Sequence, residues 1–276
     1  MLIQQVSIHR IGGSLTEDQK DIVAVEEPLE IRLEADFEGK REETKIAITM
    51  RTPGNDEELA LGFLFSENII HHFSAILSLA HCQTAIAESG KKNVIRVKLK
   101  PGIRFDSARL QRNFFANSSC GICGKASLDA VEMNCSRKED NHLQVSSTLL
   151  CQLPEALRMA QSAFRLTGGI HAAGLFNQAG ALLAFREDVG RHNALDKLIG
   201  WGLMHEIDFS DKLLLLSGRT SFELIQKAAM AGVPLVAAIG APSSLAVDLA
   251  LRMNITLVGF LKSTGLNVYS NFRNIV

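Results

Sequence analysis

The sequence predicts an α/β protein, because three short apolar segments alternate with helical segments in its last third. Lys212–Leu216, Leu235–Ile239 and Ile255–Leu261 are almost continuously apolar, which is typical of strands that are buried on both faces of a parallel sheet. The segments between them, Thr220–Ala231 and Ser243–Met253, have the length and spacing of helices. We therefore expect a mostly parallel sheet with helices packed on it.

The first half of the chain is more polar and predicts a smaller α+β unit. Ile31–Phe37 and Thr44–Met50 flank a turn and indicate a β-hairpin. Asn55 or Asp56 is placed to cap a helix over Glu57–Asn68. The other elements expected before residue 210 are strands at Asn93–Leu99, Gly168–Ala173 and Gly180–Phe185, and helices at Asp106–Phe115, Pro154–Phe164 and Asn193–Leu203.

The change in composition along the chain predicts two structural units, a smaller one over residues 1–140 and a larger α/β unit over residues 141–276. The chain holds 276 residues, which suits one large domain or two modest ones. Hydrophobic residues make up 46% and charged residues 21%, and this is the balance of a folded globular protein rather than a disordered one.

Charge and targeting patterns exclude several classes of protein. Lys and Arg total 29 against 30 Asp and Glu, so there is no basic excess to hold a nucleic-acid backbone. The N-terminus has no basic start followed by an apolar core. The longest apolar stretches are about seven residues, far short of the roughly 20 that a membrane-spanning helix needs. We expect a cytoplasmic protein without nucleic-acid or membrane partners.

The five cysteines carry the sharpest chemical signal. An odd count in a chain of this length argues against a disulfide framework and for a reducing compartment. Cys120 and Cys123 form a Cys-x-x-Cys pair among small, turn-forming residues, which predicts an exposed loop. Such a pair can be half of a zinc site, a thioredoxin-like redox pair, a nucleophile that carries sulfane sulfur, or two unremarkable thiols. The spacing alone does not choose among these four.

A zinc site would need more ligands than the sequence offers. Structural zinc takes four ligands, and no second Cys-x-x-Cys and no His-x-x-x-His accompanies the pair. Zinc deaminases require His-x-Glu and Pro-Cys-x-x-Cys, but His-x-Glu is absent and Ser119 precedes Cys120. We therefore expect no zinc and no deaminase chemistry.

A dense polar block, Glu187–Lys197, stands directly before an apolar helix. One interpretation is structural: Asp188 or Asn193 caps the helix, and Asp196 and Lys197 are solvated. The functional interpretation instead assigns a binding role to Arg191 and His192.

Four side chains outside the cysteine pair are candidates for a binding pocket, and the argument differs for each. Arg191 and His192 could bind an anion or a purine at a helix N-terminus. Arg219 follows a buried strand and suits a phosphate, although its loop is not a Walker A motif. His171 stands alone in an apolar setting, which is more typical of a core residue than of a ligand.

The segment after the last apolar strand combines an aromatic ring, a cation and small residues. Such a surface suits stacking and phosphate contacts with a nucleotide-bearing cofactor, although a strand that simply runs into a loop would look the same. Its residues are Phe260, Leu261, Lys262, Ser263, Thr264 and Gly265.

Several motifs, in this order along the chain, resemble the FdhD/NarQ family. They are Leu59–Leu64, Ser118–Gly124, Glu187–Lys197, Ser217–Glu223, Ala241–Ala246 and Ile255–Phe260. The resemblance extends from about residue 45 to the C-terminus, and the Glu-Asp-Val-Gly-Arg-His sequence is its most specific part.

The resemblance implies a sulfurtransferase accessory protein for formate dehydrogenase. Members of the family take sulfur as a persulfide from a cysteine desulfurase and deliver it to the molybdenum bis-molybdopterin guanine dinucleotide cofactor of the apo-enzyme. The family's persulfide cysteine carries over to Cys120, with Cys123 as an assisting or relaying thiol. Its cofactor-binding segment carries over to the six residues Phe260–Gly265. Arg191, Arg219 and Lys262 are candidate clamps for the cofactor phosphates.

The resemblance also has consequences for the fold and the assembly. It implies a three-layer C-terminal domain that is similar in fold to cytidine deaminase but lacks its zinc, and it implies a homodimer. Ser263-Thr264-Gly265 departs from the more basic ending of some relatives. Two alternatives to sulfur transfer are a cofactor carrier or chaperone for apo-formate dehydrogenase, whose thiols are incidental, and a zinc-binding regulatory protein.

Overall fold

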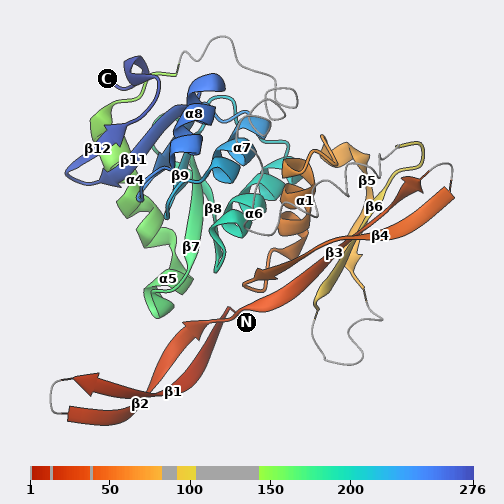
Figure 1. Ribbon diagram of the computed structural model, residues 1–276, viewed down its shortest axis with the longest axis horizontal. Helices are drawn as coiled ribbons and strands as arrows, with labels where there is room; N and C mark the ends of the chain where they lie inside the picture. Colours follow the sequence, from red (N-terminus) through yellow and green to blue (C-terminus); the bar gives the residue numbers. More distant parts are fainter. Residues whose placement is uncertain (1, 13–14, 38–39, 83–91, 104–142) are drawn as a thin grey trace.

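The computed structural model describes residues 2–12, 15–37, 40–82, 92–103 and 143–276 (Figure 1). The expected helix at Asp106–Phe115, the loop that holds Cys120 and Cys123, and the expected domain boundary after residue 140 lie outside these residues. That boundary therefore stays a prediction.

Three sheets are seen in the part of the chain that the structure describes, with two, four and six strands. The elements of the first part are β1 (Ile3–Gly12), β2 (Leu15–Ala24), β3 (Glu27–Phe37), β4 (Lys40–Arg51), α1 (Asp56–Ser66), a 3-10 turn at Phe73–Ala75, β5 (Ile76–His81) and β6 (Val94–Leu99). Those of the second part are α4 (Ser147–Ala160), α5 (Ser162–Thr167), β7 (His171–Phe176), β8 (Leu182–Asp188), α6 (Arg191–Met204), β9 (Leu213–Leu216), α7 (Phe222–Met230), β10 (Leu235–Ala238), α8 (Ser244–Arg252), β11 (Thr256–Lys262), β12 (Gly265–Val268) and a 3-10 turn at Phe272–Asn274.

The four-stranded sheet is built around the expected hairpin of β3 and β4. Its strand order is β4-β3-β6-β5, with β6 parallel to β3. Every second residue of β3 is completely buried, which is the alternation of a strand with one face in a core. These residues are Leu29, Ile31, Leu33 and Ala35. They share one hydrophobic core with apolar residues of α1, so the helix covers this face of the sheet.

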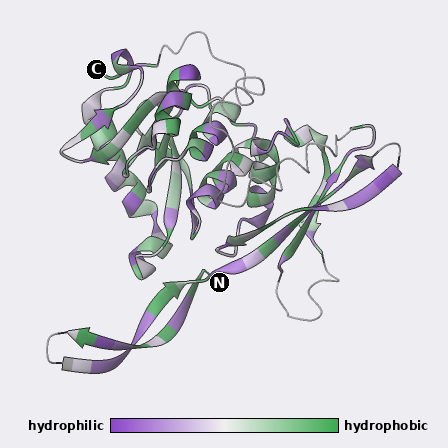
Figure 2. Cartoon of the chain, in the orientation of Figure 1, coloured by the Kyte–Doolittle hydropathy of each residue, from purple (hydrophilic) through white to green (hydrophobic). Residues whose placement is uncertain are grey.

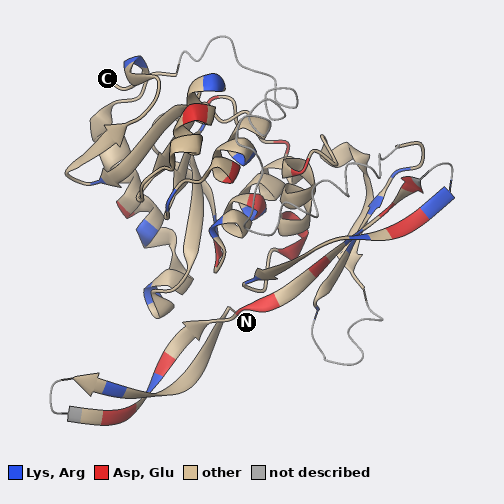
Figure 3. Ribbon diagram, in the orientation of Figure 1, with Lys and Arg blue, Asp and Glu red and all other residues tan. Residues whose placement is uncertain are grey.

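The opposite face of this sheet carries alternating acidic and basic side chains (Figure 3). Arg32 lies 2.6 Å from Glu30 and 3.0 Å from Glu43, and Glu34 accepts hydrogen bonds from Arg41 and pairs with Lys98. Cross-strand pairs of opposite charge stabilise a solvated sheet face by a few tenths of a kcal/mol up to about 1 kcal/mol each. This face is therefore a polar surface rather than a second core.

The six-stranded sheet has the order β12-β11-β10-β9-β7-β8. Strands β9, β10 and β11 are parallel, as the apolar segments predict, whereas β7 and β8 form an antiparallel hairpin at one end. Helices α6, α7 and α8 share one core with this sheet, and α4 shares a separate core with it. Hydrophobic residues gather between these helices and the sheet (Figure 2). The larger part is thus a three-layer α/β structure.

Two glycines allow α1 and α6 to cross at very short range. A Cβ atom placed on Gly62 would lie 1.8 Å from the backbone oxygen of Asp196, and one on Gly200 would lie 1.8 Å from that of Glu58. Glycine alone lacks a Cβ atom, so glycine at these two positions lets the backbones of α1 and α6 come into direct contact. This crossing joins the core of the four-stranded sheet to that of the six-stranded sheet.

Several element boundaries differ from those predicted. The helix expected from Pro154 begins seven residues earlier at Ser147, where Ser146 accepts a hydrogen bond from Leu149 N–H. The two strands expected at Gly168–Ala173 and Gly180–Phe185 begin later and end later. Gly168, where the first of these strands was expected to begin, instead ends α5 in the left-handed conformation. Asn55 precedes α1 but makes no side-chain cap. Four strands were not predicted: β1, β2, β5 and β12.

The helix crossing predicts a position-specific loss of stability. Gly62→Ala places a methyl group where the Asp196 carbonyl lies, so the helices must separate, and overpacking of this kind costs about 1–3 kcal/mol or more. Urea denaturation measures the change in the free energy of unfolding. Gly169→Ala is the matched control, because its only neighbour within 4 Å would be 3.8 Å away. Equal stabilities of the two variants would contradict the tight crossing.

Candidate functional site

The ends of four neighbouring strands meet along one edge of the six-stranded sheet. Backbone hydrogen bonds continue past the strand ends: Ser217 N–H donates to Ala172 O at 2.9 Å. Gly240 N–H donates to Gly218 O at 3.1 Å, and Phe260 N–H donates to Gly240 O at 3.1 Å. We call this row of neighbouring strand ends, from Ala172 through Ser217–Gly218 and Gly240 to Phe260, the strand-end edge. Parallel α/β sheets bind ligands at the carboxyl ends of their strands, and the sequence-predicted site residues of the described chain gather there.

Phe260 is exposed and has an unusual backbone conformation. Its φ of 50° lies in the left-handed region, and its side chain is 44% exposed. The pairing of β11 with β12 shifts register between Gly259 and Lys262, which marks a β-bulge. A left-handed non-glycine residue costs about 1 kcal/mol or more. Strain of this kind is common at ligand sites.

An open surface pocket of about 460 Å³ lies beside this ring. It is lined by Phe260, Lys262, Thr264, Gly265, Leu266 and Asn267. Four of these residues belong to the predicted cofactor segment, and Leu266 and Asn267 extend it. Leu261, by contrast, is 1% exposed and packs in the core that the sheet shares with α4. An aromatic face and an ammonium group beside one cavity can stack a base and pair with a phosphate.

His171 and Arg191 both lie close to Gly218, at the other end of the strand-end edge. A Cβ on Gly218 would be 3.1 Å from His171 Nδ1 and 3.8 Å from Arg191 Cδ. Burial lowers the pKa of His171, and the positive charges of Arg191 and His192 lower it further. His171 is therefore a half-buried residue at a polar corner rather than a core residue, and its neutral form is favoured.

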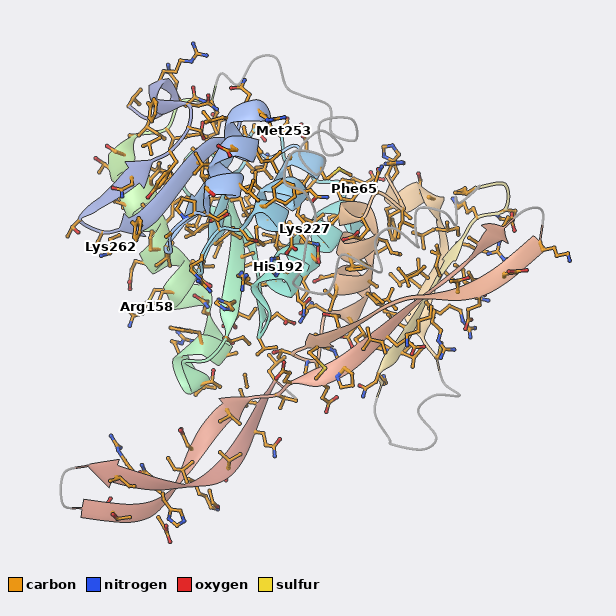
Figure 4. The ribbon with its side chains drawn as sticks, in the orientation of Figure 1. Phe65, Arg158, His192, Lys227, Met253 and Lys262 are labelled. Carbon is orange, nitrogen blue, oxygen red and sulfur yellow. The ribbon has the colours of Figure 1, made fainter. Side chains whose placement is uncertain are left out.

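His192 links the start of α6 to the start of α7. Its Nε2 lies 3.2 Å from Ser221 Oγ and 3.0 Å from Glu223 Oε2. The hydrogen bond with His192 lowers the pKa of Glu223, and Lys227 and Arg191 contribute in the same direction. Figure 4 shows His192 and Lys227 on these two helices. His192 thus has its own acidic partner.

Four polar residues of the block are buried, namely Asp188, Asn193, Asp196 and Lys197, which corrects the interpretation that Asp196 and Lys197 are solvated. Lys197 and Asp188 are 1% and 0% exposed and pair at 2.7 Å. Asp188 also accepts from the backbone N–H of Thr52 at 3.1 Å, and Lys197 donates to Thr52 O at 2.8 Å. Asp188 further accepts from Gly190 N–H at 2.8 Å and from Asn193 Nδ2 at 3.1 Å. These contacts tie the turn before α1 to the start of α6.

A second buried ion pair involves Asp196, the residue directly before Lys197 on α6. Asp196 Oδ1 accepts from Lys227 Nζ at 2.8 Å and from Ser66 Oγ at 2.9 Å. Burial raises the pKa of Glu67 beside this pair, although the charge of Lys227 opposes the rise. Sequence reasoning missed Lys227, because a lysine in an apolar helix gives no sign of the carboxylate that it meets on another helix.

The predicted site residues therefore fall into three groups. Phe260, Lys262, Thr264 and Gly265 line the pocket, and the side chains of His171 and Arg191 both lie close to Gly218. Cys120 and Cys123 lie outside the described residues. Among the described residues, no group of three or more His, Cys, Asp or Glu side chains is placed to hold a metal ion. None of the described helices is both long and apolar enough to span a membrane.

His171 provides a test of this geometry. Arg191→Gln should raise the pKa of His171 toward 6.5 but not restore it fully, because burial, the larger cause, remains. Because the pKa of His171 is lowered in the folded protein, the free energy of unfolding decreases as the pH falls from 6.5 through that pKa. In Arg191→Gln this decrease should be smaller. NMR titration of the imidazole measures the shift. Arg158→Gln on α4 should change nothing, and an unchanged His171 in Arg191→Gln would contradict the contact.

Comparison with known proteins places the chain among relatives of one type. It is 48% identical over 265 residues to a protein of Streptomyces coelicolor named "Sulfur carrier protein FdhD", covering 95% of this chain and 91% of the relative. It is 40% identical over 273 residues to a protein of the same name from Sulfolobus acidocaldarius, covering 98% of each chain.

A solved structure has the same fold. It is the crystal structure of a protein proposed to be a formate dehydrogenase accessory protein, from Desulfotalea psychrophila, with a TM-score of 0.75, 23% identity and full coverage of both chains. This likeness confirms the α/β fold class, whereas the finer expectation of a deaminase-like layout stays a prediction. The model of the FdhD/NarQ family matches residues 24–276. The chain therefore belongs to the FdhD/NarQ family.

Proposed function

We propose that this protein is a sulfur carrier for formate dehydrogenase that works as a sulfurtransferase through a persulfide on Cys120. The observation that carries the proposal is the Cys120–Cys123 pair in a chain whose relatives are named sulfur carrier proteins. The sulfur donor is a cysteine desulfurase, and the acceptor is the molybdenum bis-molybdopterin guanine dinucleotide cofactor destined for apo-formate dehydrogenase. A homodimer, which the family resemblance implies, is part of the same proposal.

In the loading step, the Cys120 thiolate attacks the outer sulfur of the donor persulfide. A bond forms between the Cys120 sulfur and that outer sulfur while the donor's own S–S bond breaks, and the donor cysteine leaves as a thiolate. One S–S bond replaces another, so the step needs no oxidant or reductant.

In the delivery step, the Cys123 thiolate attacks the Cys120 sulfur. A disulfide forms between the two cysteines, and the outer sulfur leaves as hydrosulfide, which becomes a ligand of the cofactor metal. The two cysteines are oxidised to the disulfide, and the two electrons that they give up reduce the outer sulfur to hydrosulfide. A cellular thiol must then reduce the disulfide before the next cycle.

The cavity at Phe260 supports the cofactor part of the proposal. The cofactor is the substrate here, and its guanine would stack on the exposed ring while Lys262 pairs with a phosphate. The volume of about 460 Å³ lies within the range of small-molecule sites. The strained backbone at Phe260 is a second feature that is common where a ligand binds.

Persulfide formation tests the cysteine roles directly. After incubation with a cysteine desulfurase and cysteine, mass spectrometry should find one added sulfur atom on Cys120. Cys120→Ala should lose the adduct and all support of formate dehydrogenase in cells that lack the native copy. Cys123→Ala should keep the adduct and lose the release of sulfur. Cys151→Ala is the matched control, because Cys151 is a free thiol on α4. An unmodified but active Cys120→Ala protein would favour the non-covalent carrier.

Because the backbone of Phe260 is strained, replacing this residue by glycine separates the effect on ligand binding from the effect on stability. Phe260→Gly removes the ring, and glycine adopts a φ of 50° freely, so the melting temperature should stay equal or rise. Binding of GDP, used as the probe for the guanine nucleotide, should weaken about fivefold or more, since base stacking on an aromatic ring contributes about 1–3 kcal/mol. Calorimetric titration and thermal melting give the two readouts. Unchanged GDP affinity in Phe260→Gly would contradict this placement.

A further inference from the structure

The β1–β2 hairpin has a strand edge that the rest of the described chain leaves open. It is a sheet of two strands, so each strand pairs with one neighbour and keeps a second edge. β2 approaches α5, whereas β1 packs chiefly on β2, and Figure 1 shows the hairpin extending away from the two larger sheets. A two-stranded hairpin is only marginally stable in water, and further strands with an apolar face stabilise it. The free edge of β1 is therefore placed to receive another strand.

The two strands of the hairpin differ in charge. β2 carries four charged side chains, Glu17, Asp18, Lys20 and Asp21. Charged side chains on an edge strand discourage its pairing with another chain. β1 has no acidic residue, and both of its basic side chains face acids within the hairpin: His9 forms an ion pair with Asp18, and Arg10 lies opposite Glu17. The edge of β1 thus lacks the protection that the edge of β2 has.

The apolar residues of β1 are arranged symmetrically about Ser7. Val6 and Ile8 stand one residue to either side of it, and Ile3 and Ile11 stand four residues to either side. Ile11 is 77% exposed, although it belongs to a strand. An antiparallel pairing of two copies of β1 about Ser7 would place Val6 opposite Ile8 of the second copy. The same register would place Ile3 opposite Ile11 of the second copy.

This register gathers the apolar side chains on matching faces. Successive side chains of a strand alternate between its two faces, so Val6 and Ile8 share one face and Ile3 and Ile11 share the other. Side chains directly opposite each other in an antiparallel pair lie on the same face and stabilise it when both are apolar. Two copies of Val6 and Ile8 would therefore form one apolar cluster at the centre of the pairing.

We propose that β1 is an interaction surface for a second copy of this chain, and that two β1 strands pair antiparallel about Ser7. The two hairpins then form one four-stranded sheet in the order β2-β1-β1-β2, with the charged strands at its edges. Arg10 lies opposite Gln4 and His9 opposite Gln5 of the second copy, so no like charges meet. The surface lies before residue 24, where the family match begins, and the inference goes beyond the proposed function.

Sedimentation velocity at several protein concentrations tests the contact. Residues 3–11 of each copy are fewer than the roughly 20–30 residues a side of a standard interface, so the association should reverse on dilution. Ile8→Lys should halve the molar mass of the associated chain, because it replaces the apolar centre by two neighbouring positive charges. Gln19→Lys is the matched control, since Gln19 lies opposite Ile8 in the hairpin but on the strand away from the contact. Thermal melting verifies that both variants are folded.

Cysteine cross-linking tests the register. Residues directly opposite each other have Cα atoms about 4.5–5.5 Å apart, which is within the range of a disulfide. Under mild oxidation, Ser7→Cys should give a peptide linked to its own copy through residue 7, as mass spectrometry of a digest would show. Gln5→Cys is the matched control, because Gln5 is also exposed and on the same face. Its two copies would lie on the order of 13 Å apart along the strands and should not link.

Equal molar masses of Ile8→Lys and the unaltered chain at every concentration would overturn the proposal, whether the chain is then a monomer or associates through another surface. Equal yields of the linked peptide from Ser7→Cys and Gln5→Cys, zero included, would contradict the pairing about Ser7. If the homodimer forms through another surface, the β1 contact joins two homodimers, and Ile8→Lys should release a dimer. If β1 is itself the surface of the homodimer, the same variant should release a monomer. Either of these two results supports the contact.

Discussion

The structure depends on the backbone contact between α1 and α6. Gly62 and Gly200 let the two helices meet without side chains between them, and Ser66 of α1 donates a hydrogen bond to Asp196 of α6 beside the contact. Lys197 with Asp188 and Lys227 with Asp196 are nearly shielded from water. A buried pair stabilises a fold only when both partners and their remaining hydrogen bonds are in place, so the helix crossing and the ion pairs require each other.

One short segment of sequence serves both packing and binding. In the Glu187–Lys197 block, Asp188, Asn193, Asp196 and Lys197 are buried at the helix crossing, whereas Arg191 and His192 lie toward α7 and the strand-end edge. The helical repeat accounts for part of this division, because Asn193 and Lys197 are four residues apart and share one face, whereas His192 and Asp196 share the face toward α7. The same buried pairs that join the two cores therefore also fix where Arg191 is presented.

The sequence predicts the parallel strands and their helices well, because buried strands such as Leu235–Ala238 contain only apolar residues and glycines mark their ends. It predicts the location of Phe260 and Lys262 for the same reason. It does not reveal the partner of Lys227, since that contact joins residues 31 positions apart on different helices. Nor does it reveal β1 and β2, whose alternation of polar and apolar residues is too irregular to mark a buried face.

The β1–β2 hairpin extends away from the rest of the chain in Figure 1, and none of its residues belongs to the three hydrophobic cores. The family match begins at residue 24, where β2 ends. Mutations in the hairpin therefore carry no penalty in the packing of these three cores. For protein engineering, the exposed Ile11 on β1 offers a position for a label that leaves the helix crossing and the strand-end edge untouched.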